Sequence, residues 1–480
     1  MELAAILLAP AAVAACCLVV SRRTAAILTV IGSAVVVLLA LLAVDRVLSE
    51  GSRAGLGGWL SCDPLGALVL LLVAFVGLMA ALFSIGYLPR RHAAGGRVNG
   101  HYFSLYNLFL LSMLAVPILA NIALVWIAVA LTTLASAFLV AYEDTPEALE
   151  AAWKYVVLTT LGAVVALLGI VFLYWAMKLG GGGPFTWAGL RAAAPHLPPP
   201  VLWMGFLLVL VGFGTKAGLA PMHTWLPDAH SQAPAPICAL LSGVETTTAL
   251  YAVLRLFPVL ETAGGVGARD WFLVFGLVSA GAAALLLVYV RDYKRMFAFS
   301  TVEHMGIVMV AIGLGDPAHF GAAYQILAHA LAKSFCFFAA GAVVLVVGTQ
   351  EIASVRGLIR VSPIAAAAVL LGGLTISGAP PFTVFMSEFA ILKAGFGTAQ
   401  YVAAGLLALF VVVAFCAMMQ HVNHIVFGQA GPAQAVASLP ATCVAALVLS
   451  AIPVLVLGVY LPSGLHRLLA AAAAALGGAP

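Results

Sequence analysis

The chain has 480 residues, of which 64% are hydrophobic and only 8% are charged. Soluble domains carry about 25% charged residues, so this composition excludes a soluble enzyme or binding module and predicts a polytopic membrane protein. The formal net charge of +4 is scattered over short connections and gives no sign of nucleic-acid binding.

Apolar runs fill the chain from end to end. A membrane span needs about 20 apolar residues, and by that measure the sequence predicts about fourteen helices and an all-α fold. We expect the first run to be a retained span, because no basic segment precedes it. The predicted spans cover residues 3–20, 24–44, 64–88, 103–119, 122–142, 153–177, 201–230, 235–258, 270–290, 294–314, 318–347, 362–396, 399–427 and 437–461.

Two of these runs are interrupted by glycine and proline. The seventh breaks at Gly218 and Pro221, and the twelfth at Pro380 and Pro381. The breaks lie five spans apart, and an odd offset places repeats in opposite orientation, as in transporters. We therefore predict two inverted five-helix repeats in one membrane domain. The predicted divisions are 1–88 for N-terminal helices, 103–258 and 270–427 for the repeats, and 437–480 for a C-terminal helix and tail.

The distribution of Lys and Arg between the loops predicts the orientation. Eleven fall on one side, which we expect to be cytoplasmic: Arg22, Arg23, Arg90, Arg91, Arg97, Lys154, Arg291, Lys294, Arg295, Arg356 and Arg360. Six fall on the other: Arg46, Arg53, Lys178, Arg191, Arg269 and Arg467. An even number of spans then places both termini on the outer side.

Ionisable side chains also fall inside the predicted spans. These are Lys216, Glu245, Glu303, His304, His329, Lys333 and Glu388. Charged groups at bilayer depth are costly and usually mark ion pathways. Histidine changes charge near neutral pH, and a buried lysine can lose its proton. The row therefore predicts a proton relay through water that neighbouring hydroxyl groups would order.

Each of these groups also has a structural interpretation. Lys216 and Glu388 could belong to a buried ion pair, and Lys333 could extend to an interface. The two histidines could be hydrogen-bonded core residues. Glu303 could cap local backbone, and Glu245 has no evident partner in the sequence.

Motifs for metals and cofactors are absent from the sequence. The seven cysteines show no CxxC spacing and no Cys/His cluster, so no iron–sulfur, zinc or disulfide framework is predicted. His421 and His424 have metal-like spacing but no third ligand, which favours a solvated helix end. No nucleotide fingerprint and no nucleophile triad is present.

The segment GFGTKAGLAPMHTWLPDAHSQAPAP closely resembles the signature of antiporter-like subunits of respiratory complex I, multi-subunit sodium/proton antiporters and membrane-bound hydrogenases. The resemblance extends through DPLGALVLLLVAFVGLMAALFSIGYL, DYKRMFAFSTVEHMGIV and GAPPFTVFMSEFAILKAG. Two shorter segments, TPEALEAAWKYVVL and FSTVEHMGI, resemble the hydrogenase-4 F-type branch. That branch occurs with group 4 nickel–iron hydrogenases and formate hydrogenlyase-like complexes; NADH dehydrogenase chains M and N are the next most similar group.

The resemblance implies two inverted five-helix repeats and proton transfer along a central hydrophilic axis. Lys216 would be the lysine of the first broken helix and Glu388 the carboxylate of the second. His304, His329 and Lys333 would lie on the axis between them. The implied partners are further antiporter-like subunits and a redox arm, either a hydrogenase or an NADH/quinone module, in the cell inner membrane. The family assigns no flavin, iron–sulfur cluster or nickel to this subunit.

One residue that the family pattern leads us to expect is missing. Members usually carry a glutamate in the fifth span that pairs with the central lysine, and the matching position here is Ala130. Lys216 would then lack the anion that stabilises its charged form. In the eighth span the typical polar position is Thr247, and Glu245 lies two residues earlier. Two residues turn a helix by about 200°, so the sequence leaves open whether Glu245 substitutes.

Several functions remain open at this point. The first is a proton-translocating, or sodium-linked, subunit of a complex I-like hydrogenase or oxidoreductase, with no redox reaction of its own. The second is a degenerate, non-pumping structural arm of such a complex, which Ala130 favours. The third is a component of a sodium/proton antiporter. A stand-alone antiporter is disfavoured because the resembling proteins work in assemblies.

Overall fold

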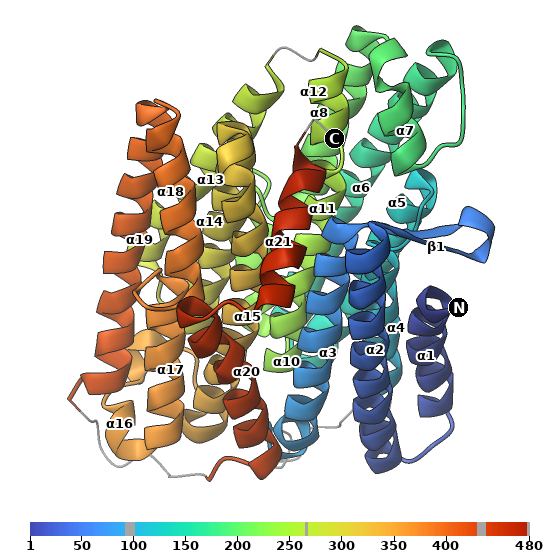
Figure 1. Cartoon of the computed structure of the whole chain (residues 1–480). Coiled ribbons are helices and arrows are strands. Elements are labelled where there is room, and N and C mark those ends of the chain that lie inside the picture. The colour runs from blue at the N-terminus through green and yellow to red at the C-terminus, as the bar shows by residue number, and fades with distance from the viewer. Residues whose placement is uncertain (92–100, 265–266, 430–437, 478–480) are drawn as a thin grey trace.

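The computed structural model describes residues 1–91, 101–264, 267–429 and 438–477. The chain forms a bundle of helices with one short β-hairpin, as the apolar runs predict (Figure 1). Arg97, which counts toward the predicted orientation, lies outside the described residues, as do the ends of the predicted 437–480 segment.

The elements follow one another in this order. The helices are α1 Glu2–Cys17, α2 Arg22–Glu50, α3 Pro64–Arg91, α4 Tyr102–Ala115, α5 Ile122–Val140, α6 Pro146–Leu179, α7 Trp187–Ala193, α8 Pro199–Ala217, α9 Trp225–Gln232, α10 Ala235–Leu240, α11 Thr246–Leu254, α12 Phe257–Thr262, α13 Ala268–Tyr289, α14 Tyr293–Leu314, α15 Asp316–Val347, α16 Leu358–Val361, α17 Pro363–Ile376, α18 Thr383–Gly397, α19 Tyr401–Phe427, α20 Ala441–Val459 and α21 Ser463–Leu476. The strands are β1 Arg53–Gly55 and β2 Leu60–Cys62. A π-helical turn, η4, covers Leu241–Glu245, and 3-10 turns cover Leu56–Gly58, Ala141–Glu143, Ala194–His196 and Ile352–Ser354.

Each predicted span lies on one helix, except that 201–230 and 362–396 each hold two and 235–258 holds α10, η4, α11 and the start of α12. Among the described residues, eleven helices are long and apolar enough to cross a membrane, and four shorter apolar helices accompany them. The chain is therefore a multi-pass membrane protein. The number of crossings stays a prediction.

Two elements were not predicted. The hairpin pairs Arg53 with Cys62 in antiparallel register between α2 and α3. The second is the amphipathic helix α21, formed by residues 463–476 within the segment predicted as a tail. Its apolar face, which includes Leu468 and Leu469, packs against α3 and α15. Fourteen residues are too few for a span on their own, so the length criterion missed this helix.

The helices run from one edge of the bundle to the other. The first helices lie at one edge and α17 to α19 at the other, while α20 and α21 lie between α3 and α15 (Figure 1). Small residues allow neighbouring helices to pack closely. A methyl group on Gly169 of α6, for example, would lie 2.8 Å from the carbonyl oxygen of Gly205 in α8.

Both interrupted runs break in the same way. Helix α8 ends before Gly218 (φ +80°), and α17 ends near Gly378 (φ +72°); the left-handed backbone at each site suits glycine. The residue after each glycine donates its N–H five residues back, from Leu219 to Gly214 at 2.9 Å and from Ala379 to Leu374 at 3.0 Å. The last carbonyl groups of both helices are thus satisfied before the chain resumes as α9 and α18.

Candidate functional site

Lys216 lies two residues before the first break and is surrounded by polar side chains. Its ammonium nitrogen lies 2.6 Å from Oε1 of Glu245, and the two side chains are 3% and 0% exposed. The same nitrogen donates to the hydroxyl of Thr133 at 2.5 Å and to that of Tyr155 at 2.9 Å. Four helical segments therefore meet at one buried cation.

Glu245 is the anion of this cluster. Besides Lys216 it accepts a hydrogen bond from the Tyr155 hydroxyl at 2.8 Å. The expectation that Lys216 lacks an anion is therefore wrong. The fifth-span residue in contact with Lys216 is Thr133, three residues from the half-exposed Ala130.

A π-helical turn explains why the direction of Glu245 was open. Residues Leu241–Glu245 form this turn, which holds an extra residue compared with an α-helix. The regular rotation of 100° per residue fails across such a turn. The turn places Glu245 at Lys216 and Ser242 at a second buried group.

That second group contains the two predicted histidines. Nε2 of His329 lies 2.9 Å from the carbonyl oxygen of Ser242, and Nε2 of His304 lies 3.0 Å from that of Ile376. The imidazole rings are 5.3 Å apart. Each Nε2 must donate, because a carbonyl oxygen only accepts.

Gln325 extends this group towards the second break. Its amide nitrogen donates to Nδ1 of His304 at 3.2 Å, and its carbonyl oxygen accepts from the Ser387 hydroxyl at 2.5 Å. Ser387 precedes Glu388 on α18. A continuous set of hydrogen bonds therefore runs from His304 to the neighbour of the predicted carboxylate.

Glu388 is buried, with 5% of the residue exposed. A methyl group on Gly378 would overlap its Oε2, so the carboxylate lies directly against the second helix break. Lys216 pairs with Glu245 instead, so Lys216 and Glu388 do not pair with each other.

Lys333 and Glu303 lie inside the bundle as well. Lys333 is fully buried and donates to the carbonyl oxygen of Phe297 at 2.6 Å and to the hydroxyl of Ser300. The interpretation in which Lys333 extends to an interface is therefore wrong.

Asp292, and not Glu303, caps the start of α14. Glu303 is 5% exposed in the middle of that helix, so the capping interpretation is also wrong.

The two groups approach each other at η4. Ser242 and Glu245 both belong to this turn, and the Ser242 hydroxyl also lies 2.6 Å from that of Thr301. Oε2 of Glu245 and Nδ1 of His329 are buried and have no hydrogen-bond partner among the described residues. Buried polar atoms of this kind are usually satisfied by water.

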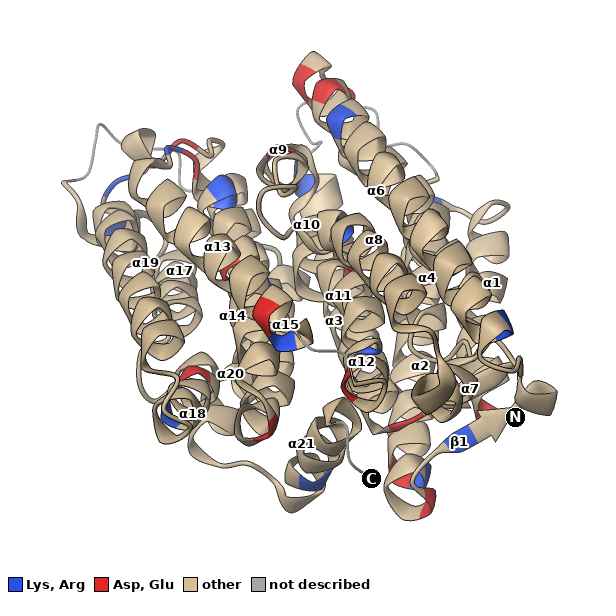
Figure 2. Ribbon diagram, turned by 90° about the horizontal axis from the view of Figure 1, so that it is seen from above, with Lys and Arg blue, Asp and Glu red and all other residues tan. Residues whose placement is uncertain are grey.

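Seen along the bundle, charged residues are sparse, and some lie on helices within it (Figure 2).

Three members of the site were not singled out by sequence reasoning: Tyr155, Gln325 and Ser387. Gln325 has a detectable signal, because it precedes His329 by four residues and shares its helical face. Tyr155 and Ser387 have none, since amphipathic aromatic and small hydroxyl residues are common in membrane helices.

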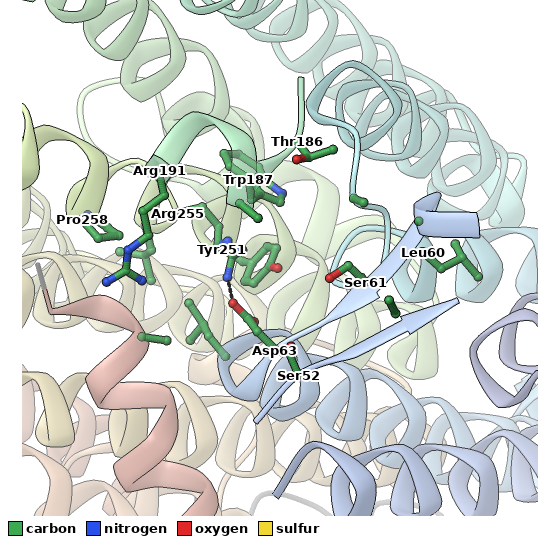
Figure 3. A pocket seen from close by; sticks show the side chains of 17 residues that line it. Ser52, Leu60, Ser61, Asp63, Thr186, Trp187, Arg191, Tyr251, Arg255 and Pro258 are labelled. Atoms are coloured by element: carbon green, nitrogen blue, oxygen red, sulfur yellow. Dashed lines mark hydrogen bonds and ion pairs between the residues drawn. The ribbon is translucent and has the colours of Figure 1, made fainter. Parts of the chain in front are cut away.

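A cavity of about 330 Å³ lies beside the hairpin, away from this row. In it Asp63 pairs with Arg255, which lies over the rings of Trp187 and Tyr251 (Figure 3). Asp63 also accepts the N–H of Gly66 at 2.9 Å and so caps α3. Burial by itself would raise the pKa of Asp63, but the Arg255 guanidinium and the Gly66 N–H outweigh it and lower that pKa. The pair ties α3 to the helix that follows Glu245.

Comparison with known proteins identifies the family. The family described as the membrane part of NADH:quinone oxidoreductase and Mrp antiporters matches residues 120–416, which include every buried group of the row. The chain belongs to this antiporter-like family. A second family, described as the N-terminus of complex I chain 5, matches residues 59–94. The predicted superfamily is confirmed.

Individual relatives give the same result. The hydrogenase-4 component F homolog of Methylacidiphilum infernorum is 36% identical, over 78% of this chain and 80% of its own length. Hydrogenase-4 component B of Escherichia coli is 30% identical over 72% of this chain, which spans about half (52%) of that longer protein. A chain of the membrane-bound sulfane sulfur reductase, an archaeal respiratory complex, is 25% identical with a TM-score of 0.87, covering 99% of this chain and 96% of that one.

In this antiporter-like chain the carboxylate beside Lys216 comes from η4, and not from the fifth predicted span where the resemblance led us to expect it. The relatives include a subunit of a solved multi-subunit membrane complex, so the protein resembles components of assemblies.

Proposed function

We propose that the chain translocates protons along the buried row, from Lys216 and Glu245 through His329 and His304 towards Glu388. The observation that carries this proposal is the fully buried pair of Lys216 and Glu245, whose charged atoms lie 2.6 Å apart. Burying two charged groups at this depth costs free energy, and the groups around the pair determine that cost.

The chemistry of the pair suits proton transfer. Removing water strengthens the attraction between the two charges, but it also raises the cost of each charge. The proton can lie on the nitrogen, which gives an ionised pair, or on the oxygen, which gives a neutral pair, and these opposing effects decide between the two. A change in a neighbouring charge alters this balance and can therefore shift the proton. The Tyr155 hydroxyl donates to the same Glu245 oxygen, Oε1, that faces Lys216.

Water would complete the route between the two groups. The free Oε2 of Glu245 and the free Nδ1 of His329 offer an acceptor on each side of η4. A water molecule bound to either atom relays a proton without movement of the backbone. From His304 the hydrogen bonds through Gln325 lead towards Glu388.

The wider assembly is also part of the proposal. A redox arm of the group 4 hydrogenase, formate hydrogenlyase or NADH:quinone type would drive the relay, and this chain would hold no cofactor. The named relatives, two hydrogenase-4 components, support the hydrogenase type. The chain would lie in the cell inner membrane with both termini outside, in accordance with its loop charges.

The structural-arm interpretation loses its main support. It was favoured by Ala130, which seemed to leave Lys216 without a carboxylate. Glu245 supplies that carboxylate, and Thr133 and Tyr155 complete the contacts of the ammonium group.

The test is Lys216→Ala in the intact complex. We expect proton translocation to be lost while the redox reaction of the soluble arm continues. Lys393→Ala is the matched control, because Lys393 is an exposed lysine on α18. Unchanged proton translocation in Lys216→Ala, with normal assembly, would rule the proposal out. If the complex translocates sodium ions instead of protons, the proposed ion is wrong but the proposed route stands.

A further inference from the structure

A second cavity, of about 560 Å³, opens at the start of α2. Arg22 and Arg23 line it together with apolar side chains from three helices, among them Ile27, Ile85 and Phe103. The turn between α1 and α2 lies at the lower end of the bundle (Figure 1). By the predicted orientation, Arg22 and Arg23 belong to the side that carries most loop arginines, including Arg90 and Arg91 in the last turn of α3. The cavity is therefore both cationic and apolar.

No described residue neutralises the positive charge of this cavity. Neither Arg22 nor Arg23 forms an ion pair within the described ranges, and there Nη2 of Arg22 is buried without a hydrogen-bond partner. The residues outside the described ranges contain no Asp or Glu. Both arginines occupy the first turn of α2, which Ser21 caps. The helix dipole is positive there, so two further cations are unfavourable unless an anion binds.

An apolar stripe on α2 leads away from the cavity. Ile27, Ile31, Val35 and Leu38 are 49%, 54%, 42% and 62% exposed. Steps of four, four and three residues place them on one face of the helix. At 1.5 Å per residue the stripe is about 16 Å long, which matches half of the roughly 30 Å hydrocarbon core.

We infer that this cavity binds the phosphate headgroup of an anionic phospholipid, whose acyl chain lies along the exposed stripe of α2. Arg22 and Arg23 supply donors that suit phosphate oxygens. The stripe has the length of a single leaflet, which a free phosphate ion would not need. Basic pockets between membrane helices are a known way of holding anionic lipids.

The experiment measures lipid binding to the purified full chain. Detergent-solubilised protein is titrated with phosphatidylglycerol or phosphatidylcholine of the same acyl chains, and the lipid-bound fraction is read by native mass spectrometry. We expect wild-type protein to prefer phosphatidylglycerol. Arg22→Gln combined with Arg23→Gln should weaken phosphatidylglycerol binding by about thirtyfold and leave phosphatidylcholine binding unchanged.

A matched variant separates this site from general surface charge. Arg90→Gln combined with Arg360→Gln removes two exposed charges that do not line the cavity, and it should retain phosphatidylglycerol binding. Equal losses in the two double variants, or no loss in either, would overturn the inference. Ile31→Ser should weaken binding of the intact lipid, because it lies in the middle of the stripe.

Inorganic phosphate distinguishes the lipid from a free anion. If the site recognises a lipid, millimolar phosphate should leave most phosphatidylglycerol bound, since the acyl chain contributes to affinity. Displacement at that concentration, with Ile31→Ser behaving like wild type, would mean a free-anion site and contradict the inference. Unchanged thermal unfolding of the variants excludes misfolding as the cause of a loss.

Discussion

Glu245 holds the ammonium group of Lys216 from the eighth predicted span, 2.6 Å away, where the family pattern leads one to expect a carboxylate from the fifth. The fifth span contributes only the neutral hydroxyl of Thr133. Because the carboxylate comes from η4, the ion pair is linked to His329: the same turn carries Glu245 and the Ser242 carbonyl that accepts from His329. A change in the charge of the pair therefore acts on the same turn that holds the first histidine.

Moving the carboxylate between helices tests this relationship. Glu245→Gln leaves Lys216 as a buried charge without an anion, and losing one partner of such a pair costs about 3–5 kcal/mol. We expect proton translocation by the complex to fall by about a hundredfold or more. Adding Thr133→Glu should restore part of it, because that position already contacts the lysine at 2.5 Å.

Ala130→Glu in the Glu245→Gln background is the control for that rescue. Thr133, and not the half-exposed Ala130, is the fifth-span residue bonded to Lys216, so a carboxylate at Ala130 should restore less translocation than one at Thr133. Equal or better rescue from Ala130 would show that the lysine is held differently from the arrangement described here.

The second helix break predicts a difference between two glycines. Alanine at Gly378 or Gly348 must adopt positive φ (+72° and +79°), which costs about 1–2 kcal/mol at either position. At Gly348 the new methyl group meets no atom of the described residues within 4 Å, but at Gly378 it overlaps the carboxylate of Glu388. Gly378→Ala should therefore lower both thermal stability and proton translocation, whereas Gly348→Ala should lower only stability.

Similar losses of translocation in the two alanine variants would contradict this assignment. They would mean that backbone strain alone, and not displacement of Glu388, disturbs the route.

Much of the fold could be predicted because a membrane span has a simple physical signature. Long apolar runs located the helices, and paired Gly-Pro interruptions located both breaks, including Gly218 and Pro381. The amphipathic helix α21 and the hairpin were missed, since neither has the length or apolarity of a span.

The site could be predicted only in part. Buried charges such as Lys216 are conspicuous in an apolar sequence, but their partners depend on helix rotation. The π-helical turn at Leu241–Glu245 altered that rotation, and no residue pattern in the segment indicates such a turn. Gln325 joins His304 to Ser387 across three helices, a contact that sequence spacing cannot reveal.

Gln325→Leu tests the second half of the route. The change keeps a similar volume but removes the donor to Nδ1 of His304 and the acceptor for Ser387. Nδ1 of His304 then loses its hydrogen-bond donor, while the bond from Nε2 to the Ile376 carbonyl keeps the tautomer, and we expect proton translocation to fall about tenfold. Ser387→Ala removes only one of these bonds and should have a smaller effect. Wild-type translocation in Gln325→Leu would place the route elsewhere.

The ion pair of Asp63 and Arg255 predicts a stability that depends on pH. Its side chains are 24% and 17% exposed, and Asp63→Asn should lower the free energy of unfolding by about 2 kcal/mol at neutral pH. Asp270→Asn is the control, because Asp270 is exposed and forms no ion pair with a described residue. It should change stability by less than about 1 kcal/mol.

The sign of the pH effect follows from the lowered pKa of Asp63 in the folded chain. The pKa of Asp63 is lower in the folded chain than in the unfolded chain, where it is about 3.9, so the carboxylate contributes its full stabilisation at pH values above about 3.9. This contribution is lost as the pH falls through the pKa of the folded state. The difference in unfolding temperature between wild type and Asp63→Asn should therefore be constant from neutral pH down to about pH 5 and shrink below pH 4. A difference that grows on acidification would mean that Arg255 does not hold Asp63 in its charged form.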